Sequence, residues 1–74
     1  MAEIQLESPV TGVVWKVVAG PGTVVAAGDT ILIVESMKME IPVEATEAGT
    51  VAEVMVSEGD QVSEGDWVAV LEAD

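Results

Sequence analysis

The sequence contains no cysteine, no histidine and no arginine, and its only cationic side chains are two lysines. The absence of cysteine excludes disulfides, thiolate zinc sites and cysteine nucleophiles. The absence of histidine excludes a Ser-His pair and imidazole metal ligands, so a free-standing enzyme is not expected. With 14 acidic residues the net charge is −12, and neither nucleic acid nor an anionic membrane is an expected partner.

The chain is short, but it is apolar enough to fold. Its 74 residues are 50% hydrophobic and include 15 valines, which favour β-strands. A chain of this length forms one domain, whose core contributes roughly 3–5 kcal/mol. The N-terminal residues lack the pattern of a signal peptide, and no uncharged run is long enough to span a bilayer. We therefore expect a cytoplasmic protein.

An internal repeat organises the sequence into two halves, residues 1–37 and 38–74. Eleven of the 37 superposed positions are identical, whereas chance predicts about four. Glycines are prominent among these identities, and they fix backbone geometry rather than polarity alone. The glycine pairs are Gly12 and Gly49, Gly22 and Gly59, and Gly28 and Gly65.

Each half contains short strand patterns separated by turn signals. The predicted strands are 4–6, 13–18, 24–25 and 31–35 in the first half, and 40–43, 51–56, 61–62 and 67–71 in the second. No window has a sustained helical period. We therefore predict an all-β fold: a flattened barrel or sandwich of two four-stranded antiparallel sheets, related by a pseudo-two-fold axis. Such an axis places the link between the halves and the chain termini at opposite ends.

Lys38 lies in the link between the halves, between Met37 and Met39. A turn between strands would ordinarily contain Asn-Gly or Asp-Gly. Two interpretations remain open at this point. In one, a single long strand runs from Ile31 to Ile41, with Lys38 in solvent and the methionines in the core. In the other, a turn presents Lys38 for covalent modification and the methionines are gripped by the modifying enzyme.

The segment around Lys38 resembles the attachment motif of the biotinyl/lipoyl domain family, in the form found in biotin carboxyl carriers. The motif residues are Glu35, Ser36, Met37, Lys38, Met39 and Glu40. The resemblance covers about residues 6–72 and includes the turn glycines. Ser36 departs from the alanine that is usual in biotin carriers, and Val10 stands where methionine is frequent. The equal spacing of residues 12–28 and 49–65 indicates a minimal domain without the protruding loop, or thumb, of some carriers.

The resemblance implies that biotin is attached covalently to Lys38 and that Met37 and Met39 contribute to recognition by a biotin protein ligase. The chain would then be a non-catalytic carrier. It would move a carboxyl group from a biotin carboxylase to a carboxyltransferase, and we expect an acyl-CoA carboxylase. A domain of a eukaryotic carboxylase would lie in the mitochondrial matrix or plastid instead of the cytoplasm.

Two alternatives remain. One is a lipoyl domain of a 2-oxo acid dehydrogenase complex, although such domains usually have Asp before the lysine and Ala after it. The other is an unmodified structural module, which would have no reason to keep Met37, Lys38 and Met39 together.

Other groupings of residues are weaker candidates. Trp15 and Trp67 are expected to be packing residues, and Lys16 is expected to be an exposed surface residue within a strand. Four acidic residues lie close together without the spacing of an EF-hand, so no metal site is expected. These are Glu58, Asp60, Glu64 and Asp66.

Overall fold

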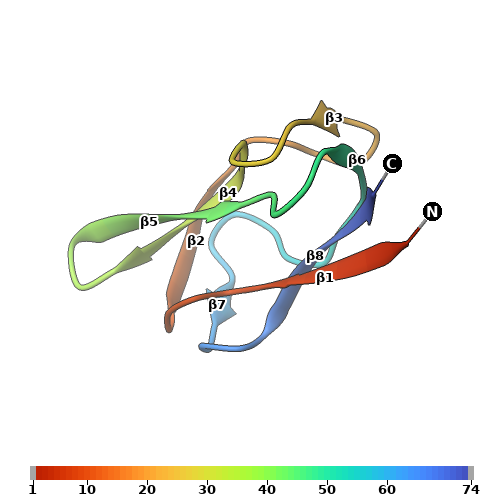
Figure 1. The fold of residues 1–74 in the computed structure, drawn as a ribbon. Coiled ribbons are helices and arrows are strands. Elements are labelled where there is room, and N and C mark those ends of the chain that lie inside the picture. Colours follow the sequence, from red (N-terminus) through yellow and green to blue (C-terminus); the bar gives the residue numbers. More distant parts are fainter. Residues whose placement is uncertain (1, 74) are drawn as a thin grey trace.

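A computed structural model describes residues 2–73, which form eight β-strands and no helix (Figure 1). The strands are β1 (Glu3–Glu7), β2 (Gly12–Val17), β3 (Val24–Val25), β4 (Thr30–Ser36), β5 (Met39–Glu44), β6 (Gly49–Val54), β7 (Gln61–Val62) and β8 (Trp67–Ala73). All eight overlap the strands predicted from the sequence. β3 and β7 have the predicted bounds, whereas β4 and β8 extend beyond them at their C-terminal ends.

The strands form two antiparallel sheets with the orders β1-β8-β6-β3 and β5-β4-β2-β7. A shift of 37 residues exchanges β1 with β5, β2 with β6, β3 with β7 and β4 with β8, and so converts one order into the other. The register obeys the same shift, since Ile4 pairs with Leu71 and Ile41 pairs with Val34. The predicted fold class, with its pseudo-two-fold symmetry, is therefore confirmed.

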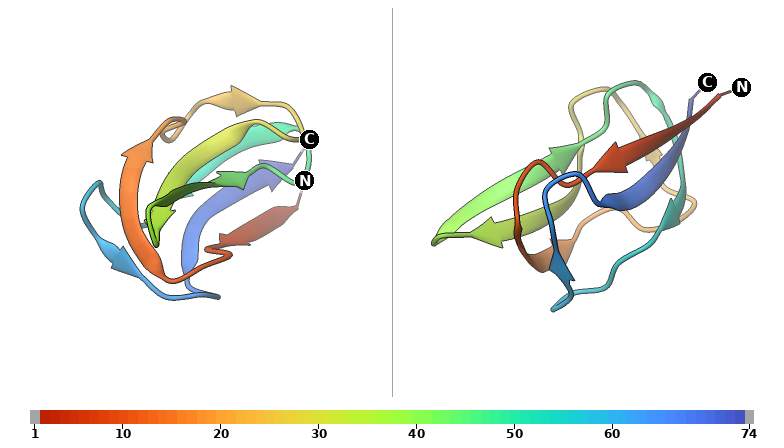
Figure 2. Two further views of the ribbon diagram at one scale, coloured as in Figure 1. Left: turned by 90° about the vertical axis from the view of Figure 1, so that its left-hand side faces the viewer. Right: turned by 90° about the horizontal axis from the view of Figure 1, so that it is seen from below.

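The core lies between the two curved sheets, which wrap around it when the molecule is viewed along its length (Figure 2, left). Alternation sends roughly every second side chain inward, and these positions hold aliphatic residues. In β4 and β8 two consecutive residues are buried, Ile31 with Leu32 and Val68 with Ala69. The buried cluster consists of Leu6, Val14, Ala19, Val25, Ile31, Leu32, Val34, Val43, Ala45, Val51, Val62, Val68, Ala69 and Leu71.

The interpretation of the two tryptophans as packing residues is wrong. Trp15 is 48% exposed and Trp67 is 57% exposed. Their neighbours Val14 and Val68 are buried and occupy the inward positions, so alternation turns both indoles outward. Trp15 also lies where the register of β2 with β4 shifts between Val14 and Lys16.

The molecule is elongated, with principal extents of 35 × 17 × 16 Å. The β4–β5 hairpin projects at one end, and both chain ends lie at the other (Figures 1 and 2). There the Ala73 N–H donates to the Ala2 carbonyl at 2.8 Å. The link and the termini therefore lie at opposite ends, as the repeat predicts.

The connections that follow the first long strand of each half are also equivalent. Residues 18–23 join β2 to β3 and residues 55–60 join β6 to β7, so the first half has no inserted thumb. Among the described residues there is no helix with the length and apolar character needed to cross a membrane.

Candidate functional site

The β4–β5 hairpin ends in a two-residue turn formed by Met37 and Lys38. The last strand pair is Ser36 with Met39, so only these two residues lie between the strands. Met37 has φ 50° and Lys38 has φ 69°. Positive φ at both central residues is the signature of a type I′ hairpin turn. The alternative of one long strand from Ile31 to Ile41 is therefore wrong.

This turn is strained, because neither residue is glycine or asparagine. Left-handed backbone brings Cβ close to the following carbonyl oxygen and costs roughly 1–2 kcal/mol per residue. Met37 and Lys38 are the two non-glycine residues with positive φ among residues 2–73. The chain thus keeps Met-Lys at a position where Asn-Gly would be more stable. Strain at a single, exposed point supports a functional role for that point.

We predict that Met37→Asn combined with Lys38→Gly raises the free energy of unfolding by about 1–2 kcal/mol, since both residues tolerate the type I′ geometry. Chemical denaturation measures this change. Met37→Ala is the matched control: it removes the same exposed thioether but keeps a Cβ at positive φ, and its stability should change little. A double variant no more stable than the parent would contradict the assignment of strain.

The side chains at the tip are exposed. Met37 is 93% exposed and Met39 is 62% exposed, and Lys38 between them is exposed as well. The long-strand alternative placed both methionines in the core, and this expectation is wrong. Two exposed thioethers flank the lysine and offer adaptable apolar contact to a protein that binds the hairpin.

The other motif residues lie directly below the tip. Glu35 of β4 pairs with Glu40 of β5, and both are exposed. Two like charges that face each other across a ladder repel. The pair therefore gives the hairpin a negative surface close to Lys38. Ser36, which is half-buried, instead turns to the body of the domain, where its hydroxyl donates to the Thr11 carbonyl at 2.9 Å.

Gly12 sits where the hairpin joins the body. An added Cβ at this residue would overlap the Glu35 backbone carbonyl and contact the Val34 side chain. At Gly49, the equivalent residue in the second half, an added Cβ would overlap the Glu72 carbonyl in the same way. Both glycines are thus required by close approach of two backbones.

The acidic turns have a structural explanation. The carboxylates of Asp29, Asp60 and Asp66 each accept a hydrogen bond from the backbone N–H three residues before, at 2.8–2.9 Å. Glu58 accepts from the Val17 N–H at 3.2 Å. Within residues 2–73 no three acidic side chains gather in a way that could hold a metal ion. Lys16 is exposed, as predicted.

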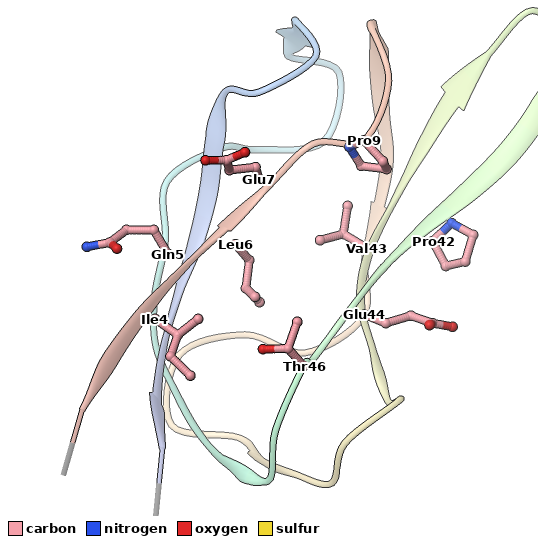
Figure 3. A pocket seen from close by; sticks show the side chains of 9 residues that line it. All are labelled: Ile4, Gln5, Leu6, Glu7, Pro9, Pro42, Val43, Glu44 and Thr46. Carbon is pink, nitrogen blue, oxygen red and sulfur yellow. The ribbon is translucent and has the colours of Figure 1, made fainter.

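A pocket of about 320 Å³ lies between the edge strands β1 and β5. Leu6 and Val43, which are equivalent residues of the two halves, point into the gap between these strands, together with Ile4 and Thr46 (Figure 3). The lining residues all come from segments 4–9 and 42–46. This pocket therefore belongs to the seam between the sheets, and the lysine hairpin forms a separate feature.

Comparison with known proteins places this architecture in a family. The family described as "Biotin-requiring enzyme" matches residues 4–71. The urea carboxylase of Kluyveromyces lactis contains a similar structure with a TM-score of 0.92 and 43% identity, covering 97% of this chain and 6% of that chain. A single-chain, multi-domain long-chain acyl-CoA carboxylase has a TM-score of 0.91 and 30% identity, covering 97% of this chain and 7% of that chain.

The chain thus spans less than a tenth of either carboxylase. The matched residues include both sheets and the strained hairpin with Lys38 at its tip. The chain therefore belongs to the biotin/lipoyl family of biotin-requiring enzymes.

Proposed function

We propose that this chain is a biotin carboxyl carrier and that biotin is joined to Lys38. The observation that carries the proposal is the turn: Lys38 is held at positive φ, exposed, at the tip of a projecting hairpin. Lys16, the other lysine, lies within β2. Membership of a family of biotin-requiring enzymes and similarity to two carboxylases support the same conclusion.

The site suits a covalently attached group. Lys38 Nζ would hold biotin through an amide: its ammonium would lose one proton, the neutral amine would displace the activating group from the carboxyl carbon of biotin, and the nitrogen would lose a second proton and keep the third. The formal charge of the chain falls from −12 by one unit, because the amide is neutral. Once bound, biotin supplies a ureido nitrogen that accepts and releases a carboxyl group.

The residues of the chain provide reach and orientation. The hairpin holds the exposed Lys38 at the projecting end of the molecule, and the four methylenes of its side chain add reach to an attached group. Tethering turns an encounter between free molecules into one at a high effective concentration. The partners under this proposal are a biotin protein ligase, which grips Met37 and Met39, and the biotin carboxylase and carboxyltransferase of one enzyme. The chain itself performs no catalysis.

The acceptor of the carboxyl group is a separate part of the proposal. We propose an acyl-CoA carboxylase, in line with the similarity to a long-chain acyl-CoA carboxylase. Urea carboxylase is the alternative, and the identity of 43% to the Kluyveromyces lactis enzyme supports it. Transfer assays with acyl-CoA thioesters and with urea as acceptors distinguish the two.

The proposed function is tested by reconstituting transfer. The biotinylated chain alone should be inert with ATP and bicarbonate, whereas addition of its own biotin carboxylase should start ATP consumption. Free biotin at equal concentration should be much less effective, because it lacks the docking surface. Added salt should slow the reaction, because it screens the attraction between the acidic chain and a basic surface around the partner's active site. The Glu35–Glu40 pair beside the tip is part of this acidic surface. No stimulation of that carboxylase by a fully biotinylated chain would contradict the carrier function.

The choice of biotin over lipoate is assigned to Met37 and Met39. We predict that Met37→Asp combined with Met39→Ala, the residues usual in lipoyl domains, shifts modification toward lipoate without unfolding the chain. Both side chains are exposed, so little core packing is lost. Mass spectrometry after competition between a biotin ligase and a lipoate ligase reads the result. The matched control is Met55→Ala, an exposed methionine outside the hairpin, which should stay biotinylated. Unchanged biotinylation of the double variant would contradict the role of the methionines.

A further inference from the structure

The two ends of the molecule have equivalent backbone hydrogen bonds, so their side chains can be compared directly. At the lysine end, the loop between β1 and β2 is fastened to the β7–β8 turn by two bonds through Ser8: its N–H donates to the Asp66 carbonyl, and its carbonyl accepts from the Gly65 N–H, both at 2.9 Å. The equivalent bonds at the other end run through Ala45, with Asp29 and Gly28, both at 2.8 Å.

The side chains of the two ends differ systematically. Three hydroxyl residues of the lysine end have alanine as their counterpart 37 residues later; the pairs are Ser8 and Ala45, Thr11 and Ala48, and Ser36 and Ala73. Each of the three hydroxyls makes a hydrogen bond. Ser8 Oγ donates to the Val10 carbonyl at 2.6 Å, and Ser36 Oγ donates to the Thr11 carbonyl at 2.9 Å. Thr11 Oγ1 accepts from the Glu64 N–H at 3.0 Å.

Two of these hydroxyl residues, Thr11 and Ser36, lie where the β4–β5 hairpin extends beyond its pairing with β2. The pairing of β2 with β4 ends at Val13 and Glu35, and Ser36 pairs only with Met39 of the hairpin itself in that sheet. The Ser36–Thr11 bond therefore extends the attachment of the hairpin one residue further, to within two residues of Lys38. Thr11 in turn is held by the β7–β8 turn through Glu64.

We propose that Thr11 and Ser36, with the backbone N–H of Glu64, form a hydroxyl clamp that positions the lysine hairpin. Ser36 is a positioning residue: it acts on Lys38 through the backbone of β4 and touches no reacting atom. The clamp limits the directions in which the hairpin leans from the body, and so restricts the space that a group on Lys38 explores. This consequence rests on the proposed carrier function, whereas the clamp itself does not.

The asymmetry of the repeat supports this assignment. The general fold does not need the hydroxyls, because the other end builds the same β1–β2-type loop and the same glycine contact with alanine at all three positions. The feature that sets the ends apart is the hairpin with Lys38 at one and the chain ends at the other (Figure 1). The hydroxyls thus accompany the hairpin rather than the sheet architecture.

The test uses Ser36→Ala on the full, unmodified chain. Hydrogen exchange of the Ser36 and Met39 backbone amides, which close the hairpin, should become about five-fold faster. The closed hairpin loses a hydrogen bond of ordinary strength, so the free energy of local opening falls. Exchange of the buried β8 amides of Val68 and Leu71 should change much less. Ser36→Thr keeps the hydroxyl and should restore slow exchange. The matched control Ser63→Ala removes an exposed hydroxyl of the β7–β8 turn and should leave the hairpin amides unchanged.

A second measurement links the clamp to function. After biotinylation, the Ser36→Ala chain should have a kcat/KM with its carboxylase several-fold below that of the parent and of Ser63→Ala, because a looser tip has a lower effective concentration at the partner site. Hairpin exchange that stays at the parent rate in Ser36→Ala would overturn the clamp, whether or not the chain carries biotin. Faster exchange with undiminished transfer would overturn its positioning role. A chain that never accepts biotin would contradict the proposed function. The hydrogen-exchange measurement on the unmodified chain would still test whether the clamp exists.

Discussion

Lys38→Arg should abolish biotin attachment and leave the fold intact. The guanidinium of arginine is not acylated by the ligase, whereas charge and approximate length are kept. Residue 38 is exposed at the tip of the β4–β5 hairpin, so substitution should change the free energy of unfolding by no more than about 0.5 kcal/mol. Intact-mass spectrometry after incubation with biotin, ATP and a biotin protein ligase reads the loss, and denaturation checks the fold.

Lys16→Arg is the matched control, since it makes the same chemical change at the other lysine. Lys16 lies within β2 rather than in a turn, and this variant should be modified as fully as the parent. Biotin mapped to Lys16 in a digest, or labelling that persists in Lys38→Arg, would contradict the assignment of the attachment site.

Gly12→Ala should lower the free energy of unfolding by about 3 kcal/mol, at the upper end of the usual range for overpacking. The added Cβ overlaps the Glu35 carbonyl, a backbone atom that no side-chain rotation can move away. Because Glu35 lies in β4 only three residues before Lys38, the same change should displace the lysine hairpin and slow biotinylation. Chemical denaturation measures stability, and the initial rate of labelling measures the displacement.

Two other glycines serve as controls. Gly49→Ala repeats the backbone overlap at the opposite end, against Glu72, so it should lose similar stability while the labelling rate of the folded chain stays near that of the parent. Gly20→Ala places a Cβ in open space and should be nearly neutral in both measurements. Equal slowing of labelling by Gly12→Ala and Gly49→Ala would show that stability alone governs the rate.

Much of the fold follows from periodicity and repetition in the sequence. Alternating valines and regularly spaced glycines predict each strand, and the 37-residue repeat predicts two equivalent sheets with the link and termini at opposite ends. Strand ends are less predictable, because they depend on hydrogen bonds between distant segments. For example, the Val18 and Ala19 N–H groups both donate to the Ile31 carbonyl, and β2 ends at Val17.

The tip illustrates the limit of local reasoning. Met37 and Lys38 both pay a steric cost at positive φ, so their residue types argue against the turn that the chain forms. The turn forms because both flanking strands are fixed by the register of β4 with β5. The resemblance of the motif identified Lys38, but local sequence alone left the two interpretations open.

The clamp and the tryptophans were missed for different reasons. The hydroxyl of Ser36 meets Thr11, which is 25 residues away in sequence, and only the folded chain brings the two together. A signal was nevertheless present in the repeat, where Ser8, Thr11 and Ser36 all stand opposite alanines. Trp15 points outward because its neighbour Val14 takes the inward position, and residue type alone does not reveal which of the two is buried.

The central claim is that Lys38 carries biotin rather than lipoate or no group at all. The most direct test is to incubate the unmodified chain with biotin, lipoate, ATP and both ligases, and then to record its intact mass and map the adduct by digestion. The account predicts one biotinyl group per chain, attached to Lys38. A lipoyl adduct, a biotinyl group on another amine, or an unmodified chain would contradict it.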